Sequence, residues 1–483
     1  MDRVLCAKAQ TPRRISLFLP SACSSSGTSM FLPLRRLSGE ISAPLRRSLR
    51  MAASRPPWAM VCKKPELDAS GAPPPGRQRA FLDLNEAPCV SQFSVPADLA
   101  YPEAAGSVRA ASCDGLLLLD FADTRQFPPA VRKLCHKSLL HEMAVSGDGA
   151  HLDVARFVCN PLSGQLCRLP APDTDAVKMG TPPFGLLTQS PEGSHGLPDR
   201  FVVAQLGRGE GDSSSRVLRR YLSDTGEWDE RELLAPSTAP PAWRAMQIDT
   251  DHEVLALGDR LWWVDLSLGV CSVDPFSDRP EHRFVELPDC SALPAAETGG
   301  LALAESPLLS RYRRLGVSEG KLRYVQLCNI HQPFQIVSFS LDAETCSWTL
   351  DHAIKIAETS PDHIFNAPWI AAIDPFKANV LYLQYGGAVV ALDMAKGVEI
   401  WRSPLPDTIA RQMNRRSRLF LPCVLPPWLA SSYIPATVRH HSLEAGFILL
   451  FSYFGDRDMS IKVFDETRRR RDYHGDNTDE EDD

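Results

Sequence analysis

The middle of this 483-residue chain repeats one short pattern, and that pattern constrains the fold more than any other feature. An apolar strand is followed by Asp or Asn, then by a few turn residues that often include Gly, and then by a second strand that ends on Trp or Leu-Pro. Copies lie at 157–170, 221–228, 261–288, 339–348 and 389–401. Asp and Asn cap turns through a side-chain oxygen and Gly adopts a positive φ freely, so each copy predicts a β-hairpin.

Long helical periodicity is scarce between residues 80 and 465, which favours a mainly β fold. The turn centres, near Gly164, Gly226, Gly269, Cys346 and Gly397, lie 43 to 77 residues apart. Blades of about 40–50 residues with insertions fit that spacing. Radial stacking buries both faces of each small sheet and hides most strand edges. We therefore predict a β-propeller-like repeat of antiparallel meanders with about six blades, and two packed β-sandwich domains are the alternative.

Composition predicts the domain boundaries. Residues 1–56 are rich in Arg, Ser, Leu and Pro and nearly free of acidic side chains, which is typical of an organellar presequence. Because Met51 opens a Met-Ala-Ala-Ser run, an untranslated upstream extension is the alternative. We predict a Pro/Gly/Ala-rich linker at 57–78, a propeller-like domain at 79–465 and a charged disordered tail at 466–483.

The same two interpretations of the N-terminal segment give two predictions of location. If the segment is translated and cleaved, we expect a mitochondrial or chloroplast protein. Otherwise we expect a protein of the cytoplasm or nucleus.

Charge and cysteine spacing exclude several classes of function. The first sixty residues hold ten basic side chains and two acidic ones, yet the whole chain carries a net charge of −7, so the remainder is strongly acidic and repels nucleic acid. No apolar run approaches the roughly 20 residues that span a bilayer. The thirteen cysteines lack the paired short spacings of a zinc site. We predict a monomer without nucleic-acid binding, membrane span or cofactor.

Catalytic patterns are also missing from the sequence. It has no phosphate-binding glycine loop and no nucleophile elbow. His136 and His141 are five residues apart, off the spacing that places two metal ligands on one helix face. Asp265 and Asp274 resemble a pair of catalytic carboxylates, but both follow apolar strands, where Asp usually caps a turn. We therefore predict that the protein is not an enzyme and that these two aspartates cap turns.

Two neighbouring aromatic residues are the candidate partner-binding surface. Trp262 and Trp263 point to opposite sides of a predicted strand. One of them is expected in the core, and the other between blades or on an accessible rim. The predicted insertions at 171–200 and 206–216 are candidate recognition loops, because the strands of a propeller are committed to packing.

Several of these segments together resemble a plant family that is abundant in grasses, the domain of unknown function 1618. The resemblance spans most of residues 100–435, and its most specific part is the tryptophan–aspartate strand with its Asp-Pro-Phe continuation. The matching segments are Cys113–Leu118, Asn160-Pro161, Trp262–Leu266 with Asp274–Phe276, Arg283–Pro288 and Val389–Met394.

The resemblance implies no established activity. The blade-like segments of that family are similar to F-box-associated and kelch propellers, which present substrates to ubiquitin ligases. Residues 1–80 of this chain lack a recognisable F-box helical module.

Together these observations predict a non-catalytic, propeller-like scaffold that binds an unknown protein partner. Two alternatives stay open at this point. One is a ubiquitin-ligase substrate adaptor without a recognisable F-box. The other is an organellar enzyme whose active site lies in the propeller channel and draws residues from several blades.

Overall fold

The computed structural model divides the chain into two units, Ser54–Ala436 and a second unit made of Met1–Ala53 with Thr437–Asp483. The predicted presequence and tail lie almost entirely outside the described residues. The structure describes residues 5–8, 55–68, 79–96, 101, 103–135, 154–172, 183–190, 198–208, 216–233, 246, 253–288, 309–329, 334–356, 368–385, 387–412, 419–430, 434–435, 448–453, 459–464 and 470–471.

The second unit contains one antiparallel sheet. Its strands are β1 (Leu5–Lys8), β27 (Ile448–Tyr453), β28 (Met459–Phe464) and β29 (Arg470–Arg471), paired in that order. Composition places the end of the propeller at residue 465, but the unit Ser54–Ala436 ends earlier. The difference arises because β27 pairs with β1 instead of joining a propeller sheet.

Five four-stranded antiparallel sheets form most of the first unit, and in each of them the strands pair in sequence order. These sheets confirm the predicted antiparallel meanders. Their strands are β6 (Ala104–Ala111), β7 (Leu117–Asp123), β8 (Val154–Cys159) and β9 (Leu166–Leu169); β10 (Phe184–Gln189), β11 (Arg200–Arg208), β12 (Arg216–Leu222) and β13 (Glu227–Leu233); β14 (Val254–Leu257), β15 (Arg260–Asp265), β16 (Gly269–Val273) and β17 (His282–Glu286); β18 (Arg313–Ser318), β19 (Lys321–Asn329), β20 (Phe334–Asp342) and β21 (Ser347–Ile356); and β22 (Trp369–Ile373), β23 (Val380–Tyr385), β24 (Ala388–Asp393) and β25 (Val398–Pro404).

A further sheet joins the two ends of the unit. Its order is β26 (Phe420–Val424), β2 (Trp58–Cys62), β5 (Val90–Pro96) and β3 (Glu66–Asp68), and β4 (Phe81–Asp83) also pairs with β5. β2 runs antiparallel to β26 and parallel to β5. This sheet is therefore five-stranded and mixed, and the prediction of about six antiparallel meanders is slightly too high.

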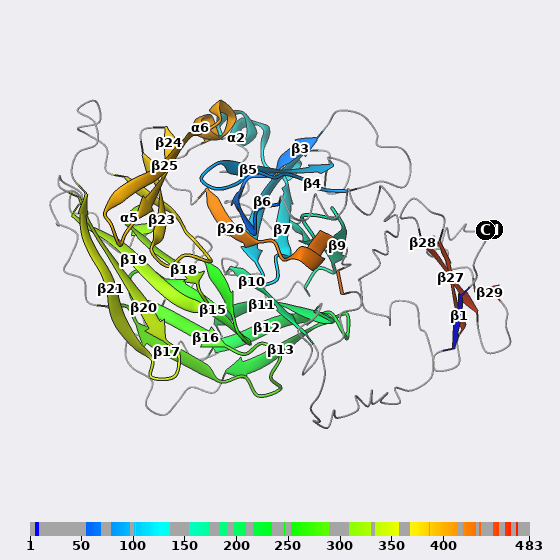
Figure 1. Ribbon diagram of the computed structural model, residues 1–483. Helices are drawn as coiled ribbons and strands as arrows, with labels where there is room; N and C mark the ends of the chain where they lie inside the picture. Colours follow the sequence, from blue (N-terminus) through cyan, green and yellow to red (C-terminus); the bar gives the residue numbers. More distant parts are fainter. Residues whose placement is uncertain are drawn as a thin grey trace, which may run out of the picture. The chain divides into compact units, whose positions relative to one another are not determined.

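The sheets form a closed ring, which makes the unit a β-propeller (Figure 1). The first strands β6, β10, β14, β18 and β22 contact one another in that order, and β26 closes the circle by contacting both β22 and β6. The short helices of the unit lie in the connections between strands. They are η2 (Thr124–Gln126), α2 (Pro129–Leu134), α5 (Leu309–Tyr312), α6 (Asp407–Gln412) and η6 (Pro427–Ala430).

The hydrophobic core lies between successive blades. Trp263 on β15 packs with Leu187 and Val202 of the preceding blade, and Trp262 packs with Leu315 and Tyr324 of the following one. Burying a large apolar side chain stabilises a fold by roughly 1.5–3 kcal/mol. The blades therefore hold one another together, as the expected radial stacking requires.

Turns between the third and fourth strands follow the predicted capping chemistry. Asn160 Oδ1 accepts from the amides of Leu162 and Ser163, and Asp342 and Asp393 accept from turn amides in the same way. The copy centred on Gly269 is a different hairpin, because it joins the second and third strands of its blade. Mixing two kinds of hairpin made the predicted spacing of the turns uneven.

Cys346 occupies a turn position that glycine fills in other blades. Its φ is 52°, against 74° at Gly226 and 68° at Gly397. We expect Cys346→Gly to raise the free energy of unfolding by about 0.5–1 kcal/mol, because left-handed backbone costs a residue with a Cβ about 1–2 kcal/mol and the freedom of glycine in the unfolded chain offsets part of that gain.

Urea denaturation of the purified variants tests this expectation. The matched change is Gly397→Ala, where an added Cβ would meet nothing within 4 Å, so backbone strain alone should lower stability by about 1 kcal/mol. A Cys346→Gly chain that is no more stable than its parent would contradict the argument.

The predicted linker at 57–78 contains a core strand. All five residues of β2, Trp58–Cys62, are buried, and Glu66–Asp68 forms β3. The Pro- and Gly-rich run at 71–76 lies outside the described residues. Composition averaged over the segment hid the strand, because β2 is short and its partner β26 is more than 350 residues away.

Candidate functional site

The two tryptophans predicted to form a partner-binding surface are both buried. Trp262 is 4% exposed and Trp263 is 0% exposed. They do point to opposite faces of β15, as strand geometry requires, but neighbouring blades cover both faces. Trp263 Nε1 also donates to the carbonyl of Pro183 at 3.3 Å. Neither indole is available to a partner, so this prediction is corrected.

The predicted recognition insertion at 171–200 also contains a core strand. Residues 184–189 form β10, the first strand of the second blade, and most of its side chains are buried. Between β11 and β12 only the ends of the predicted loop at 206–216 are described. His136 and His141, whose spacing argues against a metal site, lie outside the described residues.

Asp265 and Asp274 cap turns, as predicted. Asp265 Oδ1 accepts from the amide of Ser267 at 2.9 Å, and Asp274 Oδ1 accepts from the amide of Phe276 at 2.9 Å. Across the described ranges, no three His, Cys, Asp or Glu side chains converge to hold a metal ion. In the same part of the chain, no helix is long and apolar enough to cross a bilayer.

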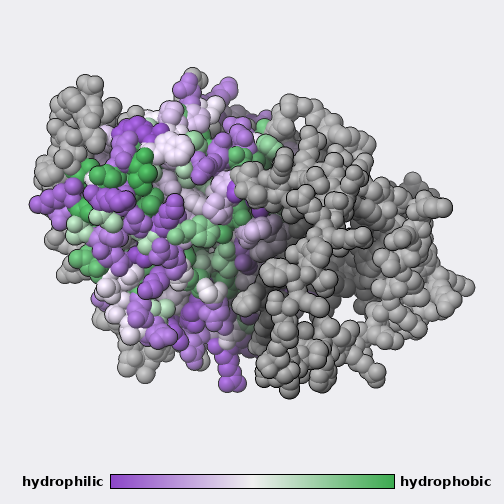
Figure 2. Space-filling model, viewed as in Figure 1, coloured by the Kyte–Doolittle hydropathy of each residue, from purple (hydrophilic) through white to green (hydrophobic). Residues whose placement is uncertain are grey.

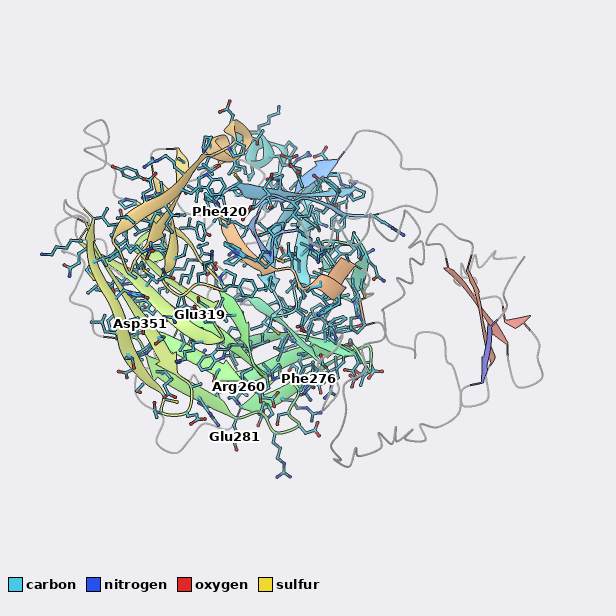
Figure 3. The ribbon with its side chains drawn as sticks, in the orientation of Figure 1. Arg260, Phe276, Glu281, Glu319, Asp351 and Phe420 are labelled. Atoms are coloured by element: carbon cyan, nitrogen blue, oxygen red, sulfur yellow. The ribbon has the colours of Figure 1, made fainter. Side chains whose placement is uncertain are left out.

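The first strands carry one buried ionic network. Arg314 on β18 donates to the carbonyls of Ala371 on β22 and of Phe420 on β26, which Figure 3 labels. Its Nη2 also lies 3.2 Å from Glu253 Oε1, just before β14, and Lys63 Nζ beyond β2 lies 2.7 Å from the same oxygen. The network connects four sheets, so its arrangement is that of a network that stabilises the fold.

Tryptophans on the outermost strands also join blades. Trp228 Nε1 on β13 donates to the carbonyl of Pro170, just after β9, at 2.9 Å. Trp348 Nε1 on β21 donates in the same way to the carbonyl of Glu286 on β17 at 2.8 Å. In both cases the indole reaches the outermost strand of the preceding blade, which explains why the sequence repeat ends on Trp.

A third tryptophan that ends a copy of the repeat, Trp401, is placed differently. The sequence repeat that contains β25 ends on Trp401, but Trp401 lies four residues after the turn glycine Gly397, whereas Trp228 lies two residues after Gly226. The register between β24 and β25 shifts here, so that Ile400 is the extra residue of a β-bulge. Bulges redirect side chains. By register, Glu399 holds in β25 the position that Trp228 holds in β13, and Trp401, beyond the bulge, is 54% exposed.

Three large apolar side chains of β25 face the solvent. Val398 is 49%, Ile400 55% and Trp401 54% exposed. We call these three residues the β25 apolar strip. Among the described strands β25 pairs only with β24, so it is also the outer edge of its sheet. Apolar surface gathers over this part of the sheet at the upper left of Figure 2.

Two charged side chains of β25 pair beside the strip. Arg402 donates two hydrogen bonds to Glu399, at 2.9 and 2.7 Å. The bond to Glu399 raises the pKa of Arg402. Sequence reasoning missed the strip, although its signal is present: three apolar residues occur within four positions, Val398–Trp401, instead of alternating with polar ones.

The ring of sheets defines the class of the protein, which is a β-propeller. The family described as "Protein of unknown function (DUF1618)" has a model that matches residues 263–382, from β15 to β23. This match supports the resemblance to that family, and it includes part of the tryptophan–aspartate strand on which the resemblance depended most.

Other comparisons add little. No curated protein matches the sequence. A protein from Lactobacillus plantarum is 13% identical, covers 76% of this chain and 82% of its own, and has a TM-score of 0.31. The β-propeller domain of Cps50 (Swd1) from Myceliophteria thermophila is 10% identical, covers 62% of this chain and 74% of its own, and has a TM-score of 0.29. An α-L-arabinanase from Penicillium chrysogenum is 12% identical, covers 85% of this chain and 99% of its own, and has a TM-score of 0.30. At these scores the likenesses carry no argument about function.

Proposed function

We propose that this protein is a non-catalytic β-propeller scaffold that binds a protein partner through the β25 apolar strip. The observation that carries the proposal is the half exposure of Val398, Ile400 and Trp401 on one outermost strand. Contiguous apolar surface on a soluble protein often marks an interaction site. An exposed strand edge also offers backbone groups to a partner strand.

The contrast with the other outermost strands strengthens the proposal. Trp228 and Trp348 donate to carbonyls of the preceding blade and so stabilise the ring. Trp401 is half exposed where it stands, so half of its surface is free for a contact outside the blade. Aromatic residues are enriched among the side chains that dominate binding energy at protein interfaces.

The residues of the strip also suggest what a partner must offer. Val398 and Ile400 are β-branched and stiff, and they lie on the unpaired edge of the sheet. An extended segment with apolar side chains would extend the hydrogen-bonded ladder and cover the strip in one step. Neither alternative function, the ligase adaptor or the channel enzyme, gains support from the described residues.

Partner capture with matched variants tests the proposal. We expect Ile400→Asp with Trp401→Asp to reduce capture of the partner at least about tenfold, because the loss of two interface anchors typically costs more than 1.4 kcal/mol. The partner must be identified by mass spectrometry and bound again as a purified protein. The thermal midpoint of the variant should match that of the parent, since both side chains are exposed.

The control variant changes exposed polar residues in a turn of the neighbouring blade. Thr345 and Glu344 lie in the turn before β21 and are both exposed. Replacing them with Ala should leave capture unchanged. If the double Asp variant binds the purified partner as tightly as the parent does, the β25 apolar strip is not the binding surface.

A further inference from the structure

Arg156 is a buried arginine whose Nε has no hydrogen-bond partner among the described residues. Arg156 on β8 is 8% exposed. Its guanidinium carbon lies 4.4 Å from the centroid of the Phe184 ring, on β10 of the next blade. Within the described part of the chain, Arg156 Nε has no hydrogen-bond partner. Buried polar groups without partners are rare in proteins, so the side chain needs an explanation.

Other buried arginines of this protein show what a structural role looks like. Arg220 is 1% exposed and donates to the carboxylate of Asp229 and to the carbonyls of Pro275 and Ser277. Arg314 is held in the same manner by two carbonyls and one carboxylate. Among the described residues, Arg156 has the stacked ring of Phe184 and the attraction of Asp120, but no hydrogen bond at Nε. Structural packing therefore does not account for its guanidinium.

The charges around Arg156 are not balanced. Arg109 Nε already lies 2.9 Å from Asp120 Oδ2, and Arg219 donates to Glu230 at 2.7 Å. Burial lowers the pKa of Arg156 to about 10, Asp120 opposes that effect, and the positive charges of Arg109 and Arg219 reinforce it. Arg156 is still protonated at pH 7. Among the described residues, Arg109 and Arg156 therefore share one carboxylate, that of Asp120, and one of these two positive charges has no carboxylate of its own.

We propose that Arg156 anchors a binding site for a single carboxylate group. One unmatched cation fits a monoanion better than a phosphate dianion, and the planar fork of arginine matches the two oxygens of a carboxylate. The site lies between the first and second blades, with Phe184 as its wall. The carboxylate belongs either to an acidic side chain of a peptide or to a small free acid. This inference is independent of the β25 apolar strip.

The test measures how added carboxylate changes the thermal midpoint of the full chain at pH 7. Chloride is replaced by acetate, or by a capped aspartate, at constant ionic strength. A ligand that binds only the native state stabilises it, and at saturation we expect the midpoint to rise by about 1–2 °C. A larger rise with capped aspartate than with acetate indicates a peptide side chain; an equal rise indicates a free acid.

Variants assign the effect to one residue. Arg156→Gln should abolish the response, and its midpoint in chloride should equal or exceed that of the parent, because a buried unpaired charge is costly. A structural arginine would instead lower the midpoint when it is removed. The matched control is Arg125→Gln, since Arg125 is held by Asp123 and should leave the response intact. Arg156→Lys keeps the charge without the fork and should respond less than half as strongly.

Several results would overturn the proposal. They are the absence of any acetate effect on the parent chain, an unchanged response in Arg156→Gln, and a response to inorganic phosphate that exceeds the response to acetate. If Arg156→Gln does not fold, the parent and Arg156→Lys still decide, because a full acetate response in Arg156→Lys rules out the arginine fork.

Discussion

A chain that begins at Lys64 is expected not to fold into the propeller, whereas a chain that begins at Ser54 should fold like the full-length protein. The first of these lacks β2, whose five residues, Trp58–Cys62, are all buried. β2 pairs with β26 on one side and with β5 on the other. Loss of β2 therefore separates β26 from β5 and from the other strands of that sheet.

The size of this effect follows from the number of contacts that depend on β2. Trp58 packs edge-on against Tyr382 of the neighbouring blade, and Met60 lies in the same hydrophobic cluster. The truncated chain also lacks Lys63, the partner of Glu253 in the buried network. Loss of five buried residues removes an amount of stability comparable to the roughly 5–15 kcal/mol that a domain usually has.

Circular dichroism and limited proteolysis of the two purified chains measure the outcome. We expect a cooperative thermal transition for the chain from Ser54 and none for the chain from Lys64. Equal midpoints in the two chains would show that β2 is dispensable and that the ring closes without it.

The same boundary bears on the N-terminal segment. A protein that starts at Met51 keeps the whole unit Ser54–Ala436. We propose two origins for residues 1–56, a cleaved organellar presequence or an upstream extension. The mature N-terminus of the native protein, measured by terminal-peptide mass spectrometry, distinguishes them.

Replacing Arg314 with Met is expected to lower the free energy of unfolding by about 3–5 kcal/mol, the usual cost of removing one partner of a buried ion pair. The side chain is 4% exposed and joins three other sheets to its own. Met is of similar length but offers no hydrogen bonds. The carbonyls of Ala371 and Phe420 lose their side-chain donor, and Glu253 keeps only Lys63 as a cationic partner among the contacts described above.

Urea denaturation of matched variants checks this value. Arg402→Gln removes an ion pair on the outer strand β25, where Arg402 is 37% exposed, and should cost within about 1 kcal/mol. Combining Arg314→Met with Glu253→Gln should cost less than the two single changes together, because the second change removes the carboxylate that the first leaves under-compensated. If the free energy of unfolding of the Arg314→Met chain is within about 1 kcal/mol of that of its parent, the network does not stabilise the ring.

Sequence reasoning was most successful for features that depend on neighbouring residues. The hairpin turns at Asn160, Asp342 and Asp393 form as predicted, and Asp265 and Asp274 cap turns as predicted. Each of these contacts spans two or three residues, so the pattern of residue types contains the necessary information. The mainly β class and the meander topology follow from the same short-range rules.

Contacts between distant residues decided the rest. β2 is a core strand because β26 lies beside it, although more than 350 residues separate them in the chain. Trp262 and Trp263 are both buried because two different blades cover the two faces of β15. Alternation within a strand cannot distinguish one covered face from two.

The sequence alone therefore determined the hairpins, their caps and the repeat class, because those depend on local backbone preferences. Only the tertiary structure decided which side chains remain available for binding. In β25, Glu399 and not Trp401 holds the register position from which Trp228 joins blades in β13. Arg156 Nε has no hydrogen-bond partner among the described residues, where Arg109 Nε lies beside Asp120. Both outcomes depend on which groups the closed ring places next to each other.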